Sequence, residues 1–152
     1  MSHINIRTFT VPFEGYWRDE NKGGIPAMSG IYCVYECTHN RREGTVTIHK
    51  LIYIGESANV RSRIAGHEKR RDWLKHVRAG NELCYNFGSI VAQDRERGEA
   101  AYIYKHKPIE NTEYVNDFPY PTTTCISEGK AFLLTPRFTV TKTVRSRYQI
   151  GW

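Results

Sequence analysis

A small set of side chains in the middle of the sequence could together perform chemistry. Tyr32 follows Gly30-Ile31, Tyr53 precedes Ile54-Gly55, and Arg63, His67 and Glu99 come later in the chain. A guanidinium binds anionic oxygens through its planar fork, and a carboxylate can hold a hard cation. Phenol and imidazole groups hydrogen-bond reacting atoms and exchange protons. These residues could therefore hold an anion and a cation beside proton-transfer groups, provided that the fold brings them together.

The two tyrosines belong to a predicted β-hairpin. Two apolar runs, 29–36 and 45–54, are separated by residues 38–44, which are rich in turn formers and charges. This pattern predicts an antiparallel hairpin. Side chains alternate along a strand, so Tyr32, Val34 and Glu36 share one face, and a tyrosine of one strand can meet its counterpart across the ladder. Gly55, at the end of the second strand, allows a sharp turn.

A helix is predicted after the hairpin, beginning near Ala58 with Ser57 as its N-cap. Asn59, Arg63 and His67 then fall at i, i+4 and i+8, which places all three on one helix face. They are either three solvated polar positions of an amphipathic helix or part of a site that faces the sheet edge.

The charge of the chain favours a polyanionic partner. The formal net charge is +6 with a pI near 9.2, and residues 57–80 hold seven Lys or Arg against two acids, a local net of +5. Such a stretch can be a solvated face or can follow a phosphate backbone. Trp73, Leu74 and Val77 predict a second helical segment in this stretch, ending at Gly80. Nucleic acid is the commonest partner of such a basic surface.

A third strand is predicted over residues 82–91, followed by a helix from about Asp94 to Lys107. Ala100, Ile103 and Tyr104 mark its buried face, and Glu99 lies beside them. An inward carboxylate is costly unless it is paired or binds a cation. Glu99 is therefore either in an ion pair, for example with Arg63, or a metal ligand.

At this point the chain resembles the GIY-YIG nuclease superfamily, over roughly residues 29–111. The resemblance rests on Gly-Ile-Tyr and Tyr-Ile-Gly in paired strands, and on later positions in the family's order and spacing: Ser57, Asn59, Arg63, His67, Glu99, Pro108 and Asn111. It implies a metal-dependent endonuclease that hydrolyses phosphodiester bonds in DNA. The catalytic residues that it implies are Tyr32, Tyr53, Arg63, His67, Glu99 and Asn111.

The resemblance also implies a role for each group. Glu99 is the single metal ligand, for Mg²⁺ with Mn²⁺ as an alternative, and Arg63 holds a phosphate oxygen. Tyr32 positions or deprotonates the attacking water, Tyr53 and His67 complete the hydrogen-bond network, and Asn111 ties the helix end to the site. The residues predicted to bind nucleic acid are Asn59, Arg61, Lys69, Arg70, Arg71 and Lys75.

The predicted fold is α/β (α+β): a small central antiparallel sheet of about three core strands flanked by helices, with extra β elements at both ends. One domain spans 1–152, with its core at 29–111 and elaborations at 1–28 and 112–152. The first residues predict an edge strand that breaks at Pro12, and the tail predicts added strands. For the tail's aromatic residues a core position is favoured over a base-stacking surface, although aromatic and basic side chains together are also what single-strand binding requires; these residues are Phe132, Phe138, Tyr148 and Trp152.

Several functions remain open within these limits. A compact stand-alone endonuclease, with single-stranded DNA as a candidate substrate, is the first; a small restriction enzyme or a structure-specific duplex nuclease is the second. A non-catalytic nucleic-acid-binding module and a protein-interaction domain with incidental charge belong to other classes. We expect a cytoplasmic protein without a membrane span, a monomer or homodimer with no obligatory protein partner. The four cysteines lack a zinc-site spacing and are expected to be reduced and buried.

Overall fold

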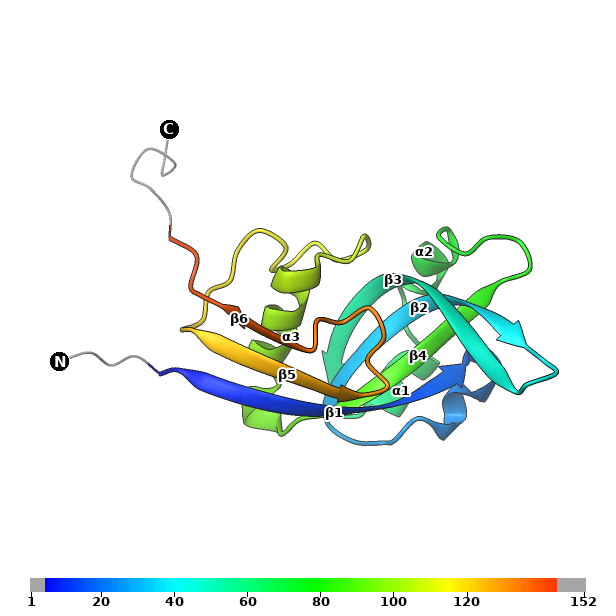
Figure 1. Cartoon of the computed structure of the whole chain (residues 1–152), viewed down its shortest axis with the longest axis horizontal. Helices are drawn as coiled ribbons and strands as arrows, with labels where there is room; N and C mark the ends of the chain where they lie inside the picture. Colours follow the sequence, from blue (N-terminus) through cyan, green and yellow to red (C-terminus); the bar gives the residue numbers. More distant parts are fainter. Residues whose placement is uncertain (1–4, 145–152) are drawn as a thin grey trace.

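A six-stranded mixed sheet forms the body of the protein in a computed structural model that describes residues 5–144 (Figure 1). The strand order is β3-β2-β4-β1-β5-β6. The strands are β1 (Arg7–Arg18), β2 (Gly30–Asn40), β3 (Thr45–Ser57), β4 (Glu82–Ser89), β5 (Thr123–Gly129) and β6 (Arg137–Val140). The helices are the 3₁₀ helix η1 (Asp19–Gly24), α1 (Val60–Ala65), α2 (Arg70–Leu74) and α3 (Ala92–His106).

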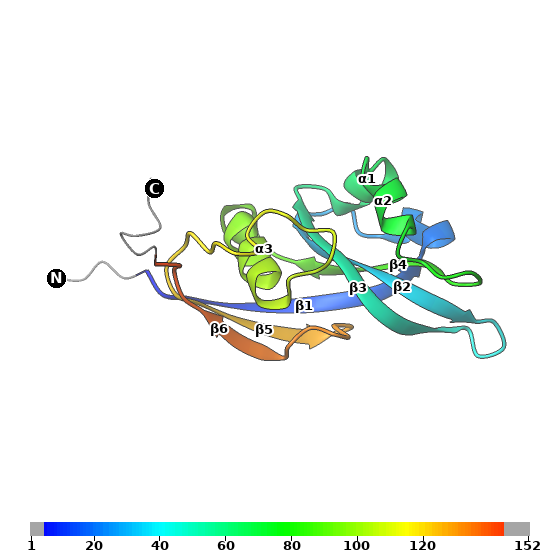
Figure 2. The ribbon, with the colours of Figure 1, turned by 90° about the horizontal axis from the view of Figure 1, so that it is seen from above.

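The predicted fold class is wrong. A three-stranded core flanked by helices was expected, but strands dominate the molecule and form one strongly curled sheet (Figures 1 and 2). The segments expected to be peripheral elaborations supply three of its six strands, β1, β5 and β6. Two of the helices, α1 and α2, have only six and five residues, so they cap parts of the sheet and do not form a layer.

The first strand is central and not the predicted edge strand. β1 runs through Pro12 for 12 residues, antiparallel to β4 on one side and parallel to β5 on the other. Pairing with β4 begins only at Phe13, so on that side the missing N–H of Pro12 removes no ladder bond. The parallel pairing with β5 joins segments more than 100 residues apart, and such a pairing leaves no local pattern in the sequence.

The predicted hairpin is confirmed, because β2 pairs antiparallel with β3 from Gly30 opposite Ser57 to Asn40 opposite Thr45. Alternation along β2 divides the core into two clusters on opposite faces of the sheet. Ile31 and Cys33 pack in the cluster that α3 covers, whereas Tyr32 and Val34 pack in the cluster with α1 and Trp73 of α2. Figure 2 shows α3 set apart from the two short helices.

The four cysteines of the chain are all buried and none forms a disulfide. Among residues 5–144, no helix combines the length and the apolar character that a membrane crossing requires.

Candidate active site

The glycines of the hairpin make room for aromatic rings. Gly55 lies directly opposite Tyr32, and a Cβ atom at Gly55 would stand 2.3 Å from the Tyr32 hydroxyl oxygen. A Cβ at Gly30 would lie 2.5 Å from the carbonyl oxygen of Gly88 and equally close to the Phe87 ring. Both positions therefore exclude a side chain for steric reasons, and Gly55 lets the Tyr32 phenol cross over its neighbouring strand.

Gly55→Ala is expected to displace Tyr32 and to lower the free energy of unfolding by about 1–3 kcal/mol, the usual cost of overpacking. Urea unfolding measures this loss. Gly23→Ala is the matched control, because no atom lies within 4 Å of the position that its Cβ would take. Equal losses in the two variants would contradict the steric role of Gly55.

Tyr32 forms a buried pair with His67. The phenol is 1% exposed, and its oxygen lies 2.9 Å from Nε2 of His67. The other ring nitrogen, Nδ1, accepts a hydrogen bond from the backbone N–H of Lys69 at 3.1 Å. In a neutral imidazole the proton must then be on Nε2, so His67 donates to Tyr32. The phenol keeps its own proton for a third group.

Burial keeps His67 neutral, lowering its pKa to about 4 with help from the positive charge of Arg63. His67 was expected on the face of a helix. Instead α1 ends at Ala65, and the side chain of His67 contacts Tyr32 from the following loop. The predicted helical position of His67 is therefore wrong, although its side chain contacts Tyr32.

Acid should destabilise the fold through His67. Between pH 6.5 and about 4 the unfolded chain binds a proton that the native imidazole does not, so stability falls as the pH falls. The full contribution is up to about 3 kcal/mol. Urea unfolding at pH 7 and pH 4.5 should give a smaller pH-dependent loss in His67→Gln than in the wild type. His49→Gln, at an exposed histidine, should behave as the wild type, and a loss unchanged in His67→Gln would contradict the assignment.

Tyr53 is the more accessible of the two phenols. Its ring centre lies 6.3 Å from that of Tyr32, 5.6 Å from that of His67 and 5.3 Å from that of Trp73. Burial and the negative charge of Glu99 raise the pKa of Tyr53 to about 12. Burial and the neighbouring phenol also raise the pKa of Tyr32. Both tyrosines are therefore neutral hydrogen-bond donors near pH 7.

Arg63 on α1 lies near these phenols, but its guanidinium is bound to a carboxylate. Its two terminal nitrogens bind the two carboxylate oxygens of Glu68 at 2.7 and 2.8 Å. Glu68, followed by the nearby Tyr32 and Tyr53, raises the pKa of the guanidinium. The same fork was predicted to hold phosphate, and it now holds a carboxylate of similar shape. The ion pair of Arg63 with Glu99, considered from the sequence, is not formed.

Glu99 on α3 is half-buried, and among residues 5–144 its carboxylate has neither a hydrogen-bond partner nor an ion pair. Burial raises its pKa to about 8, with further contributions from the negative charges of Glu56 and Glu113. Arg95, one turn earlier on α3, opposes this rise but pairs with Glu56 and also donates to Ser29 at 3.0 Å. The inward acid predicted from the sequence is therefore present, and it lacks a counter-charge.

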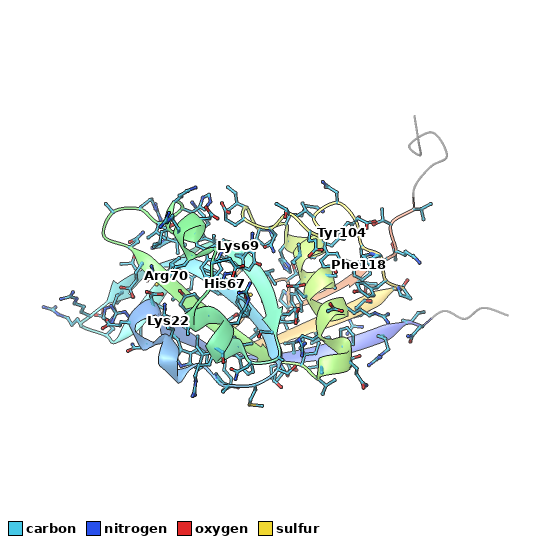
Figure 3. All side chains as sticks on the ribbon, turned by 180° about the vertical axis from the view of Figure 1, so that it is seen from behind. Lys22, His67, Lys69, Arg70, Tyr104 and Phe118 are labelled. Atoms are coloured by element: carbon cyan, nitrogen blue, oxygen red, sulfur yellow. The ribbon has the colours of Figure 1, made fainter. Side chains whose placement is uncertain are left out.

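A pocket of about 210 Å³ brings the acid to one tyrosine. Glu99 and Ile103 of α3, Tyr53 of β3 and Lys69 line it together with the loop 110–113. In Figure 3, Lys69 and His67 lie between Arg70 and Lys22 on one side and Tyr104 and Phe118, at the α3 end, on the other. Of the predicted catalytic residues, Tyr53, Glu99 and Asn111 line this pocket beside the edge strand β3, whereas Tyr32, Arg63 and His67 do not line it.

Asn111 positions the edge strand and does not point at a reacting group. Its amide oxygen accepts from the N–H of Ile54 and its amide nitrogen donates to the carbonyl of Ile54, both at 2.9 Å. The N–H of Glu110 donates to the carbonyl of Ile52 at 3.0 Å. The loop after α3 therefore fixes the backbone between Tyr53 and Gly55, the tying role that the family resemblance implied.

Most of the residues predicted to bind nucleic acid have structural partners. Asn59, and not Ser57, is the N-cap of α1, because its side chain accepts from the N–H of Ser62. Arg61 donates to the carbonyl of Ile25, and Arg70 pairs with Asp19. Lys75 pairs with Asp72, and Arg71 is exposed. Lys69 reaches the pocket of Glu99, so it is the best placed of the six.

Two neighbours of the site were missed from the sequence. Glu68 lies five residues after Arg63, and residues at that separation do not lie on the same face of a helix. The two side chains meet because the chain leaves the helix after α1. Arg95 stands four residues before Glu99 on the same helix, so the i, i+4 rule could have found it.

The residues present fit a single, weakly held hard cation. Within residues 5–144 no group of three His, Cys, Asp or Glu side chains is arranged to hold a metal. In the pocket, Glu99 and Glu113 form no ion pair within the described residues, whereas Glu110 pairs with His76. The raised pKa of Glu99 indicates that a positive charge beside it would be stabilising. Magnesium commonly binds through one or two carboxylates and keeps several waters.

Comparison with known protein families, with the curated proteins and with the solved structures finds no match to this chain.

Proposed function

We propose that the protein is a metal-dependent endonuclease that hydrolyses phosphodiester bonds in DNA. The observation that carries the proposal is the half-buried, unpartnered carboxylate of Glu99 in a pocket shared with Tyr53 and Lys69. A buried acid without a counter-charge reduces stability, and perturbed groups of this kind in a cleft are typical of functional sites. The basic charge of the chain adds support, because the substrate is a polyanion.

The charged residues of the site would bind the metal ion and the phosphate. Glu99 would hold Mg²⁺, or Mn²⁺ in its place, and the ion when bound supplies Lewis-acid polarisation of the phosphate. Arg63, released from Glu68, binds a phosphoryl oxygen through its fork. Lys69 adds a second positive charge at the pocket.

The phenols act as donors. His67 donates to the oxygen of Tyr32, which leaves the phenol's own proton for another acceptor, and we assign that acceptor to a phosphoryl oxygen of the substrate. Tyr53 donates at the mouth of the pocket, and Asn111 fixes its strand. The raised pKa of both tyrosines argues against a free phenolate as the base near pH 7.

The experiment is a cleavage assay on labelled single-stranded, duplex and branched DNA with Mg²⁺, Mn²⁺ or EDTA. We expect cleavage only with a divalent ion, and a loss of about 10²-fold in Tyr32→Phe, the usual effect of removing one aligned donor. Tyr104→Phe, at a half-buried tyrosine of α3, should cut as the wild type does. The preferred substrate separates the single-strand enzyme from a restriction or structure-specific duplex nuclease.

A non-catalytic nucleic-acid-binding module is the second candidate. The occupied fork of Arg63 and the lack of a three-ligand metal group within residues 5–144 favour it. It predicts salt-sensitive DNA binding without cleavage in any metal. A cytoplasmic location is part of either proposal, supported by four buried cysteines without a disulfide.

A further inference from the structure

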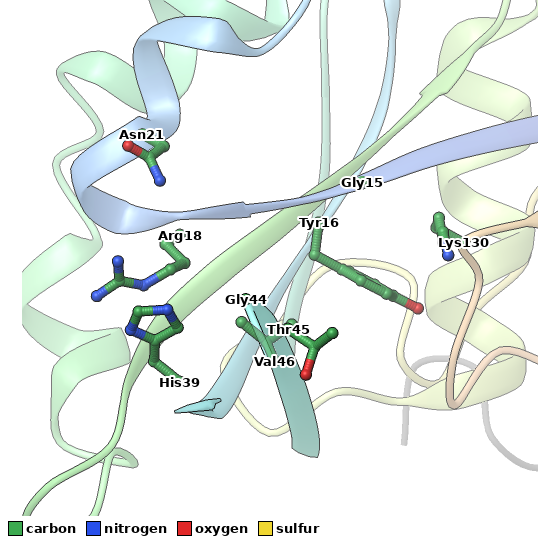
Figure 4. A pocket seen from close by; sticks show the side chains of 9 residues that line it. All are labelled: Gly15, Tyr16, Arg18, Asn21, His39, Gly44, Thr45, Val46 and Lys130. Carbon is green, nitrogen blue, oxygen red and sulfur yellow. The ribbon is translucent and has the colours of Figure 1, made fainter. Parts of the chain in front are cut away.

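One end of the sheet face that α3 covers is left open. There Tyr16 of β1 and Val46 of β3 line two adjoining pockets, of about 510 and 290 Å³. The larger extends toward Arg18 and His39 (Figure 4), and the smaller extends toward Ile48 and Phe132. We call these two pockets together the Tyr16 groove. None of its lining residues lines the pocket of Glu99.

The apolar end of the Tyr16 groove carries an aromatic ring on a fixed backbone. The N–H of Phe132 donates to the Tyr16 hydroxyl at 3.0 Å, and the Tyr35 hydroxyl donates to the carbonyl of Phe132 at 2.9 Å. Asn86 donates to the carbonyl of Lys130 at 3.0 Å. Phe132 is nevertheless 54% exposed, so the core position favoured for it is wrong. Phe138 is buried as expected, and Tyr148 and Trp152 lie outside the described residues. A large aromatic side chain on a hydrogen-bonded backbone is therefore exposed beside an open groove.

The other end of the Tyr16 groove is polar. Nδ1 of His39 is buried without a hydrogen-bond partner, and within residues 5–144 the Lys130 ammonium and the Asn21 amide have no partner either. Arg18 contributes little free charge because Glu82 and Glu20 both bind it. The available groups are therefore one cation and two hydrogen-bonding side chains, next to aromatic surface.

We propose that the Tyr16 groove binds an unpaired stretch of nucleic acid, with bases on Phe132 and Tyr16 and a phosphate at Lys130. A positive charge beside aromatic platforms is the arrangement that single strands require, because every base offers a face for stacking. In a duplex those faces are already stacked, so the ligand is single-stranded. The inference rests on the proposed function only in taking nucleic acid as the ligand, and it makes single-stranded DNA the favoured substrate.

The test measures the affinity of a fluorescent oligothymidylate by anisotropy in EDTA, in the Glu99→Gln background, so that cleavage plays no part. Phe132→Ala should weaken binding about tenfold, the usual effect of losing one stacked base. Lys130→Ala should weaken binding and reduce the dependence of log affinity on log salt by about 0.7. Ile6→Ala, another exposed apolar position, is the matched control and should bind unchanged. Urea unfolding verifies that each variant is folded.

Unchanged affinity in Phe132→Ala, or tighter binding of a duplex of the same length, overturns the proposal. The two proposals can fail separately. If the wild type cuts no DNA but Phe132→Ala weakens binding, the groove proposal stands and the nuclease proposal fails. If the wild type cuts DNA and Glu99→Gln does not, while Phe132→Ala and Lys130→Ala bind as tightly as their parent, the nuclease proposal stands and the groove proposal fails.

Discussion

Glu99→Gln should abolish DNA cleavage and make the protein more stable. Glutamine keeps the shape of the side chain but removes the charge that would hold a divalent ion, so we expect cleavage to fall by at least about 10³-fold. The same charge is costly in the native state, because burial and Glu56 raise its pKa to about 8. An active-site group that opposes folding is the expected trade between stability and function.

The size of the stability effect depends on pH. Between pH 4.5 and 8 the native carboxyl holds a proton that the unfolded chain has lost, so the stability of the wild type falls as the pH rises. Glu99→Gln lacks this loss. Its advantage should be absent below pH 4.5 and largest above pH 8, on the order of 2 kcal/mol once the solvent-exposed side of the carboxyl is taken into account.

Urea unfolding at pH 4.5 and pH 8.5, with EDTA or Mg²⁺, measures both effects. Mg²⁺ should stabilise the wild type at pH 8.5 by binding the native state alone, and should leave Glu99→Gln unchanged. Glu96→Gln removes an exposed charge one turn earlier on α3 and is the matched control for charge. If Glu99→Gln cuts DNA at the rate of the wild type, the assignment of Glu99 as the metal ligand is wrong.

Local patterns predicted the elements around the site well. Alternation and turn residues gave the β2–β3 hairpin, and apolar spacing with Pro108 gave α3, which is observed at Ala92–His106. These features depend on neighbours a few residues apart, which the sequence displays directly. The steric role of Gly55 could not be read in this way, since the ring that excludes a side chain there belongs to the opposite strand.

The errors come from long-range pairing and from loops. β1 is central because it pairs in parallel with β5, and nothing within either segment indicates the other. Helix periodicity was extended past Gly66, but α1 ends at Ala65, so the side chain of His67 reaches Tyr32 from a loop. For Phe132 a core position was favoured over a surface one, whereas two tyrosine hydroxyls hold its backbone at the surface.

The pair Arg63 and Glu68 leads to the second large effect. A phosphate oxygen pair and the Glu68 carboxylate compete for one guanidinium fork, so the ion pair must open before Arg63 binds substrate. Arg63→Ala should lower the cleavage rate by about 10²–10³-fold through loss of charge stabilisation. Glu68→Gln should act in the opposite direction and tighten DNA binding about threefold, since exposed ion pairs of this kind are weak.

A matched variant separates this competition from simple charge. Asp72→Asn removes the same unit of charge from an exposed pair with Lys75, but it leaves Arg63 bound to Glu68. Both substitutions remove a negative charge and should strengthen the attraction to DNA at low salt. The additional gain in DNA affinity of Glu68→Gln over Asp72→Asn therefore measures the effect of releasing Arg63. In the Arg63→Ala background that excess should vanish, because the freed group is no longer present. An excess that persists without Arg63 would mean that Glu68 acts only through its charge, and that the fork does not bind the phosphate.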